Sequence, residues 1–137
     1  MSFCKRKNIS DREILKIIYY LYFEEFDKLS DSKILIQIDL EKISIKSNVS
    51  TGELFGRIYH YLHPKYKFTH EIGSSSSLFH INLQNGKNKQ CSVNFPILCS
   101  VLGQLEEDFY NKKLTLSIAF LSMFISLISL VITILFK

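Results

Sequence analysis

The stretch LEKISIKSNVSTGELFGRIYHYL, residues 40–62, decides how the N-terminal part of the chain folds. Asp39 precedes it and Ser50 lies within it, and both are residue types that cap the N-terminus of a helix. Glu53 follows Ser50 at the spacing of a capping box. Between the two expected helices, Asn48 is one of the few side chains that tolerates a left-handed backbone. The stretch therefore predicts two short helices joined by a tight turn.

A longer helix is expected before this stretch. Ser10 and Glu13 form a second capping-box pattern. Apolar side chains then recur at helical spacing, at Ile14, Leu15, Ile18, Leu21, Tyr22 and Phe26. This pattern predicts a helix that ends near Leu29, and residues 34–38 are predicted to form a short strand after it.

A β-hairpin is expected after the two short helices, because apolar and polar residues alternate in segments 67–72 and 78–83. The run of serines at 74–77 is predicted to be the hairpin loop. The register that places the apolar side chains on one face pairs Ile72 with Phe79 and Phe68 with Leu83.

This order of elements resembles the winged helix-turn-helix family, over residues 9–84 and most specifically over residues 40–62. The resemblance implies an α+β fold, with a small winged-helix-like domain of three helices and a β-hairpin. The positions of the family's turn fall on Ile43, Ser44, Asn48, Val49 and Ser50, and those of the buried helix face fall on Leu54, Ile58 and Leu62.

The resemblance also implies a contact surface for DNA or another partner. Its groove-facing positions on the third helix are Thr51, Gly52, Phe55, Gly56, Arg57, Tyr59 and His60. Its phosphate-contacting positions are Lys46, Lys65 and Lys67. These residues are candidates because DNA binding depends on several cations that neutralise phosphates.

A polar segment, residues 85–90, is expected to link the hairpin to a juxtamembrane helix. The sequence thus predicts a domain over 1–90, a juxtamembrane helix over 91–113 and a transmembrane helix over 114–136. A stripe in the juxtamembrane helix either forms a short coiled-coil seam or packs onto its own domain. It consists of Leu98, Leu102, Leu105 and Phe109.

The expected transmembrane helix, residues 114–136, has 23 residues, of which 17 are apolar and none is charged. At about 1.5 Å per residue it is long enough to cross a hydrocarbon core of about 30 Å. Lys112 and Lys113 flank one end, and only Lys137 follows the other. The positive-inside rule then predicts a single-pass tail anchor with the N-terminal domain in the cytoplasm.

Small residues form one stripe along this helix. They are Thr115, Ala119, Ser122, Ser126, Ser129 and Thr133. Small side chains let helix backbones approach closely, so the stripe predicts a homodimer through the membrane helix. The alternative is a monomeric anchor that contacts only membrane lipid.

Two functions remain open at this point. Setting Lys137 aside leaves 16 basic side chains against 13 acidic ones, which is a small excess for a nucleic-acid-binding domain. The first function is a DNA-binding regulator tethered to the membrane. The alternative is a non-enzymatic protein-interaction module that recruits a partner there. A small membrane-active toxin or holin is a weaker third, because such a role needs no capped domain.

The sequence predicts no enzyme activity, cofactor or metal site, because it contains no catalytic constellation. The three cysteines, Cys4, Cys91 and Cys99, are odd in number and lack metal-type spacing, which indicates reduced thiols. His60 and His63 lie three residues apart, but no further motif completes a zinc site. Lys5, Arg6 and Lys7 form a short basic cluster that is interpreted as a solvated tail, with contact to DNA or anionic lipid as the alternative.

Overall fold

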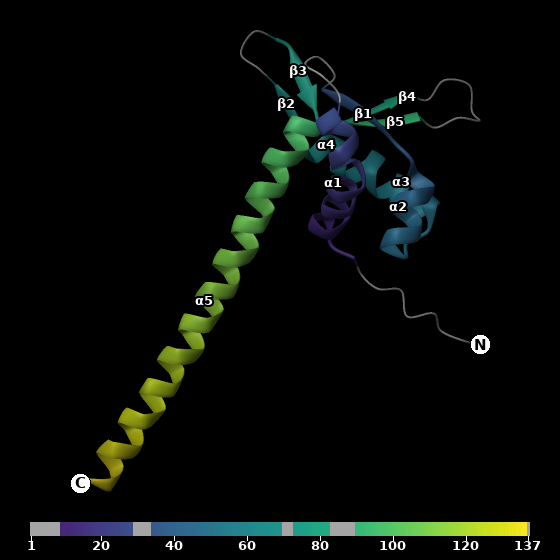
Figure 1. Cartoon of the computed structure of the whole chain (residues 1–137). Helices are drawn as coiled ribbons and strands as arrows, with labels where there is room; N and C mark the ends of the chain where they lie inside the picture. The colour runs from purple at the N-terminus through teal and green to yellow at the C-terminus, as the bar shows by residue number, and fades with distance from the viewer. Residues whose placement is uncertain (1–8, 29–33, 70–72, 83–89, 137) are drawn as a thin grey trace, which may run out of the picture. The chain divides into compact units, whose positions relative to one another are not determined.

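The computed structural model describes residues 9–28, 34–69, 73–82 and 90–136 (Figure 1). The chain divides into two compact units, Met1–Leu102 and Gly103–Lys137. The basic cluster at residues 5–7 lies outside the described residues. The fold is α+β, as predicted from the sequence.

The first unit contains four helices and five short strands among the described residues. In chain order they are α1 (Asp11–Lys28), β1 (Leu35–Ile38), α2 (Leu40–Ser47), α3 (Thr51–Arg57), a π-helical turn (Ile58–Leu62), α4 (His63–Lys65), β2 (Lys67–Thr69), β3 (Ser75–Ser77), β4 (Phe79–Asn82) and β5 (Gln90–Asn94). A last helix, α5 (Phe95–Leu135), begins in this unit and supplies most of the second.

Side-chain caps begin the first three helices, as the sequence predicts. At α1, the Ser10 amide donates to the Glu13 carboxylate at 2.9 Å and the Glu13 amide donates to Ser10 Oγ at 3.2 Å. Asp39 Oδ1 accepts the amide of Glu41 at 2.8 Å at the start of α2. Ser50 Oγ likewise accepts an amide in the first turn of α3. These bonds satisfy amides that have no partner within the helix.

The turn between α2 and α3 is also confirmed. Asn48 ends α2 with φ 56°, in the left-handed region, and it is the only non-glycine residue with positive φ in the described part of the chain. Ser44 fastens the turn, because its hydroxyl donates to the Val49 carbonyl at 2.6 Å. The short turn thereby sets the direction in which α3 leaves α2.

The strands form two antiparallel groups. In the three-stranded sheet the order is β1–β5–β4, so β5 is central, with Ile36 opposite Val93 and Phe79 opposite the same Val93. The other group is a two-stranded ribbon in which β2 pairs with β3. Figure 1 shows the β2–β3 ribbon apart from β4 and β5 of the sheet.

The predicted hairpin register is wrong. Phe68 lies opposite Ser76, and the serines expected in a loop form β3. The expected second strand bends at Leu78, whose amide donates to the Tyr66 carbonyl and whose carbonyl accepts the Asn94 amide. Leu78 and Phe79 are both fully buried, so simple alternation fails at this bend. Ile72 and Leu83 lie outside the described residues.

The expected start of the juxtamembrane helix at residue 91 is also wrong. Residues from Gln90 to Asn94 form β5, in which Cys91 and Val93 are buried on one face, and α5 begins at Phe95. The Asn94 side chain accepts the Ile97 amide at 3.3 Å and caps the new helix. The sheet thus crosses the predicted boundary at residue 90. Residues 85–89 of the predicted linker lie outside the described part of the chain.

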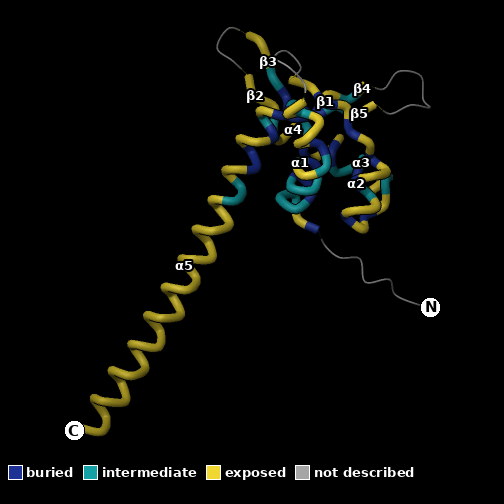
Figure 2. The backbone as a smooth tube through the Cα atoms, viewed as in Figure 1, coloured by how far each residue is buried: buried dark blue, intermediate teal, exposed yellow. Residues whose placement is uncertain are grey.

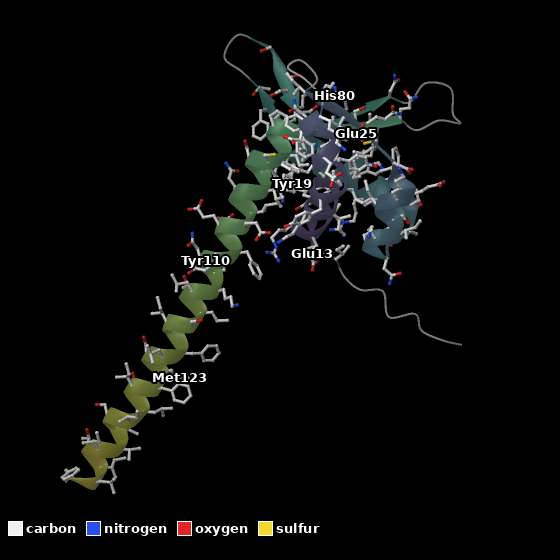
Figure 3. All side chains as sticks on the ribbon, in the orientation of Figure 1. Glu13, Tyr19, Glu25, His80, Tyr110 and Met123 are labelled. Atoms are coloured by element: carbon white, nitrogen blue, oxygen red, sulfur yellow. The ribbon has the colours of Figure 1, made fainter. Side chains whose placement is uncertain are left out.

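The core of the first unit includes the first two turns of α5. Phe95 stacks on Phe26, with ring centroids 4.5 Å apart, and on Tyr19 (labelled in Figure 3) at 5.6 Å. Leu98 and Leu102 are buried in the same unit. This part of the leucine stripe therefore packs onto its own domain and cannot form a coiled-coil seam.

The second unit is a single helical segment whose apolar side chains face outward. Figure 2 shows this part of α5 as exposed except for a stretch of intermediate burial at Leu105 and Glu106, and Tyr110 and Met123 project from it in Figure 3. Its most apolar window has a mean hydropathy of 2.7, and none of that window is buried within the chain. Within the described residues, α5 is the one helix long and apolar enough to cross a membrane.

Candidate functional site

Most of the predicted contact residues lie on the segment formed by α3, the π-helical turn and α4, whereas Lys46 lies on α2 and Lys67 on β2. Its inward side carries Leu54, Ile58 and Leu62, which are all completely buried, as predicted. The opposite side presents Gly52, Tyr59 and other predicted contact residues to solvent. Because one side of this helical segment is buried in the core, the helical period determines which side chains face the solvent.

Aromatic rings line part of the outward side. The Phe55 and Tyr59 rings stack with centroids 5.8 Å apart and planes 14° apart, and Tyr59 meets His60 edge-on at 4.9 Å. The π-helical turn places Tyr59, His60 and Tyr61 consecutively on the exposed surface between buried Ile58 and Leu62. Single π-helical turns are frequent at functional sites. Exposed aromatic rings are also common anchors in protein interfaces.

Arg57, the one arginine among the predicted contacts, is held inside the domain. Its guanidinium donates to the Ile9 carbonyl at 2.8 Å and to Asp11 Oδ1 at 2.6 Å. Only 27% of the Arg57 side chain and 19% of the Asp11 side chain is exposed, so this charged hydrogen bond is partly shielded from water. Arg57 therefore joins α3 to the start of α1 and is not free to grip a phosphate.

Lys65 shares the same carboxylate. Its ammonium lies 3.8 Å from Asp11 Oδ2, donates to the Tyr61 hydroxyl at 3.3 Å, and sits about 5 Å from the Tyr61 and Tyr66 rings. Burial acts to lower the pKa of Lys65, but hydrogen bonds with Tyr61 and Tyr66 outweigh it and raise that pKa. Two of the four predicted cations are thus paired within the domain, while Lys46 and Lys67 are exposed.

A shallow groove of about 280 Å³ lies beside the first turns of α2 and α3. Its apolar lining comes from Ile38, Leu40 and Phe55, and its acidic lining comes from Asp39 and Glu41. Thr51 and Gly52 complete it from the α3 side. The sequence interpretation identified Asp39 only as a helix cap and did not consider Glu41. Neither residue carries a local signal of binding, because acidic side chains are favoured at any helix N-terminus.

The contacts of His63 and the burial of Cys91 stabilise the fold. His63 Nδ1 lies 2.8 Å from the Phe79 carbonyl and donates to it, which ties the end of this helical segment to β4. Burial raises the pKa of Cys91 to about 12, and burial also raises the pKa of the more exposed Cys99. Among the residues with described positions, no group of three or more His, Cys, Asp or Glu side chains is placed to hold a metal ion.

The hydroxyls of the small-residue stripe in the second unit form hydrogen bonds within their own helix. Thr115, Ser122, Ser126 and Thr133 each donate to the carbonyl four residues earlier, at 2.8–2.9 Å. These hydroxyls are thus satisfied in an apolar medium without a neighbouring helix. Close packing, aided by Ala119 and Ser129, would then be the main contribution to any self-association.

Comparison with protein-family models, with curated proteins and with solved structures finds no match to this chain. The winged-helix resemblance stays a prediction from the sequence. The same holds for the contact surface on α3.

Proposed function

We propose that the protein is a membrane-anchored, non-enzymatic interaction module whose winged-helix-like domain holds a protein partner through the outward side of α3. The observation that carries this proposal is the charge on that side. Its arginine is committed to Asp11, and the adjacent groove is acidic. A surface of this kind repels phosphate and suits a protein.

The winged-helix assignment is supported by topology. Helix α1, strand β1 and two helices joined at a left-handed Asn48 come first in the chain, and β1 belongs to a sheet whose strand order is β1–β5–β4. β4 and β5 are consecutive and antiparallel, and β4 contacts the π-helical turn that follows α3. The hairpin predicted over residues 67–72 and 78–83 is wrong, so the proposal takes its support from the β4–β5 pair instead.

The membrane assignment is supported by the second unit. Phe109 and Tyr110 are exposed next to Lys112 and Lys113, where the charged part of α5 gives way to the apolar part. Aromatic and basic side chains of this kind favour the membrane–water interface. We propose that the lysine pair keeps the first unit in the cytoplasm, and that the stripe from Thr115 to Thr133 brings two copies together in the lipid.

DNA binding is the second candidate, and the exposure of Lys46 and Lys67 favours it. Each is well placed, at the end of α2 and on β2, for the phosphate contact that the family resemblance implies. Two cations are few for this purpose, because each neutralised phosphate adds to an affinity that is mainly electrostatic.

A binding experiment with DNA tests the proposal. The full chain in phosphatidylcholine nanodiscs is titrated against fluorescent mixed-sequence duplex DNA at about 50 mM and about 200 mM salt. We expect no binding at either concentration. Binding at low salt that falls steeply at high salt, and that is lost in a Lys46→Gln, Lys67→Gln double variant, would overturn the protein-partner assignment.

A further inference from the structure

We propose that the groove beside the first turns of α2 and α3 seats a basic amphipathic helix of a partner protein. The inference rests on the proposed function and names the chemistry of the partner. Three separate observations support it: the shape and lining of the groove, its charge, and two glycines on the outer side of α3.

The groove combines an apolar floor with an open side. Ile38 and Leu40 are nearly buried and supply the floor, and Phe55 forms one wall. The Phe55 ring stacks on Tyr59, so the apolar surface continues for another turn along the helical segment. A row of this length matches apolar side chains spaced three and four residues apart on a bound helix.

The charge around the groove is negative. Asp39 and Glu41 line it, and Glu53 is exposed in the first turn of α3. Within the described residues, neither lysine nor arginine lines the groove. A lysine or arginine beside the apolar stripe of the partner would therefore find a carboxylate within reach. A second copy of the same surface would bring like charges together, which argues against self-association here.

Gly52 and Gly56 lie one helical turn apart in α3. A Cβ added at either position would meet nothing within 4 Å outside the backbone of the helix itself, so packing within the domain does not require glycine. Glycine also disfavours a helix relative to alanine. The two glycines thus leave this side of α3 without side chains, and Gly52 lines the groove itself, which lets an approaching backbone come close.

The test uses the full chain in phosphatidylcholine nanodiscs and a fluorescent peptide probe. The probe is an amphipathic helix of leucine, alanine and lysine, about 18 residues or five turns long. A matched peptide has glutamate in place of lysine. We expect the lysine peptide to bind and to slow hydrogen exchange in residues 38–41 and 51–56, and the glutamate peptide not to bind.

Single substitutions test separately how the acidic side chains and the glycines contribute to peptide binding. Glu41→Lys should weaken binding of the lysine peptide about tenfold, whereas Glu24→Lys, on an exposed position of α1, should not change it. Gly52→Ala should weaken binding while leaving the fold intact. Gly103→Ala is the matched control, because its Cβ also meets nothing and it lies on α5.

The outcomes distinguish the inference from the proposed function. If the lysine peptide binds but protects another surface, or if Glu41→Lys and Gly52→Ala bind normally, the groove assignment is wrong and the protein-interaction proposal stands. If neither peptide binds, the inference is wrong. If duplex DNA instead protects residues 51–56, both the inference and the proposed function are overturned.

Discussion

The inward and outward sides of the helical segment formed by α3, the π-helical turn and α4 differ in which interactions set the role of each residue. Leu54, Ile58 and Leu62 lie inward at helical spacing and are completely buried. On the outward side, the role of Arg57 depends on Asp11, which is 46 residues away in the sequence. Periodicity alone therefore identifies the inward side. The properties of the outward side depend on contacts between distant segments.

The strongest test of this difference replaces one residue from each side. Ile58→Ala should lower the free energy of unfolding by about 3 kcal/mol, because it leaves a cavity in the core. Its neighbour Tyr59 is 39% exposed, and Tyr59→Ala should cost less than about 1 kcal/mol. Urea-induced unfolding in detergent micelles, followed by near-ultraviolet circular dichroism, measures both. Equal losses would show that the π-helical turn is packed differently.

A buried cysteine, Cys91, should make the stability of the first unit depend on pH in the alkaline range. Burial raises the pKa of Cys91 from 9.0 to about 12, so the folded protein holds this proton while the unfolded chain releases it. The stabilisation is fully present below about pH 9 and decreases as the pH rises towards the folded pKa. By about pH 10.5 the loss should reach about 2 kcal/mol.

Urea unfolding at several pH values measures this loss, and Cys91→Ala should make the decline shallower. Peptide mapping after brief treatment with iodoacetamide supplies an independent check. Cys99 is exposed and should be alkylated, whereas Cys91 should react only when the protein unfolds. Rapid alkylation of Cys91 in the folded protein would contradict its burial in β5.

A smaller effect is expected from the ion pair between Arg57 and Asp11, which joins α3 to the start of α1. Arg57→Ala should cost about 1–2 kcal/mol, because it removes two hydrogen bonds and leaves Asp11 without its main partner. The comparison is Glu24→Gln, which breaks a pair with Lys28 in which both side chains are more than three-quarters exposed. That change should cost less than about 0.5 kcal/mol. If Arg57→Ala were as mild, Arg57 would be available for DNA after all.

Local signals explain how much of the fold could be predicted from the sequence. The caps at Ser10, Asp39 and Ser50 and the left-handed Asn48 each depend on residues within one turn, and all four are confirmed. Strand pairing is not local. Phe79 lies opposite Val93, and no alternation within residues 67–83 indicates this pairing.

The candidate site was predictable to a similar extent. The outward positions on α3 follow from the helical period once its inward side is known. The engagement of Arg57 and Lys65 by Asp11 does not follow, because it requires α1 to lie against the end of α3. The sequence did not indicate the acidic groove for the same reason, because Asp39 and Phe55 line one groove only when α2 and α3 are packed together.

The last expected change is a small gain in stability at the outward side. Gly56→Ala should raise the free energy of unfolding by about 0.5–1 kcal/mol, because alanine favours the helix and reduces the freedom of the unfolded chain. The added methyl group meets nothing within 4 Å, so no strain opposes this gain. Urea unfolding measures it. A destabilised variant would mean that the domain itself needs the glycine, and the argument for a closely approaching partner would then lose this support.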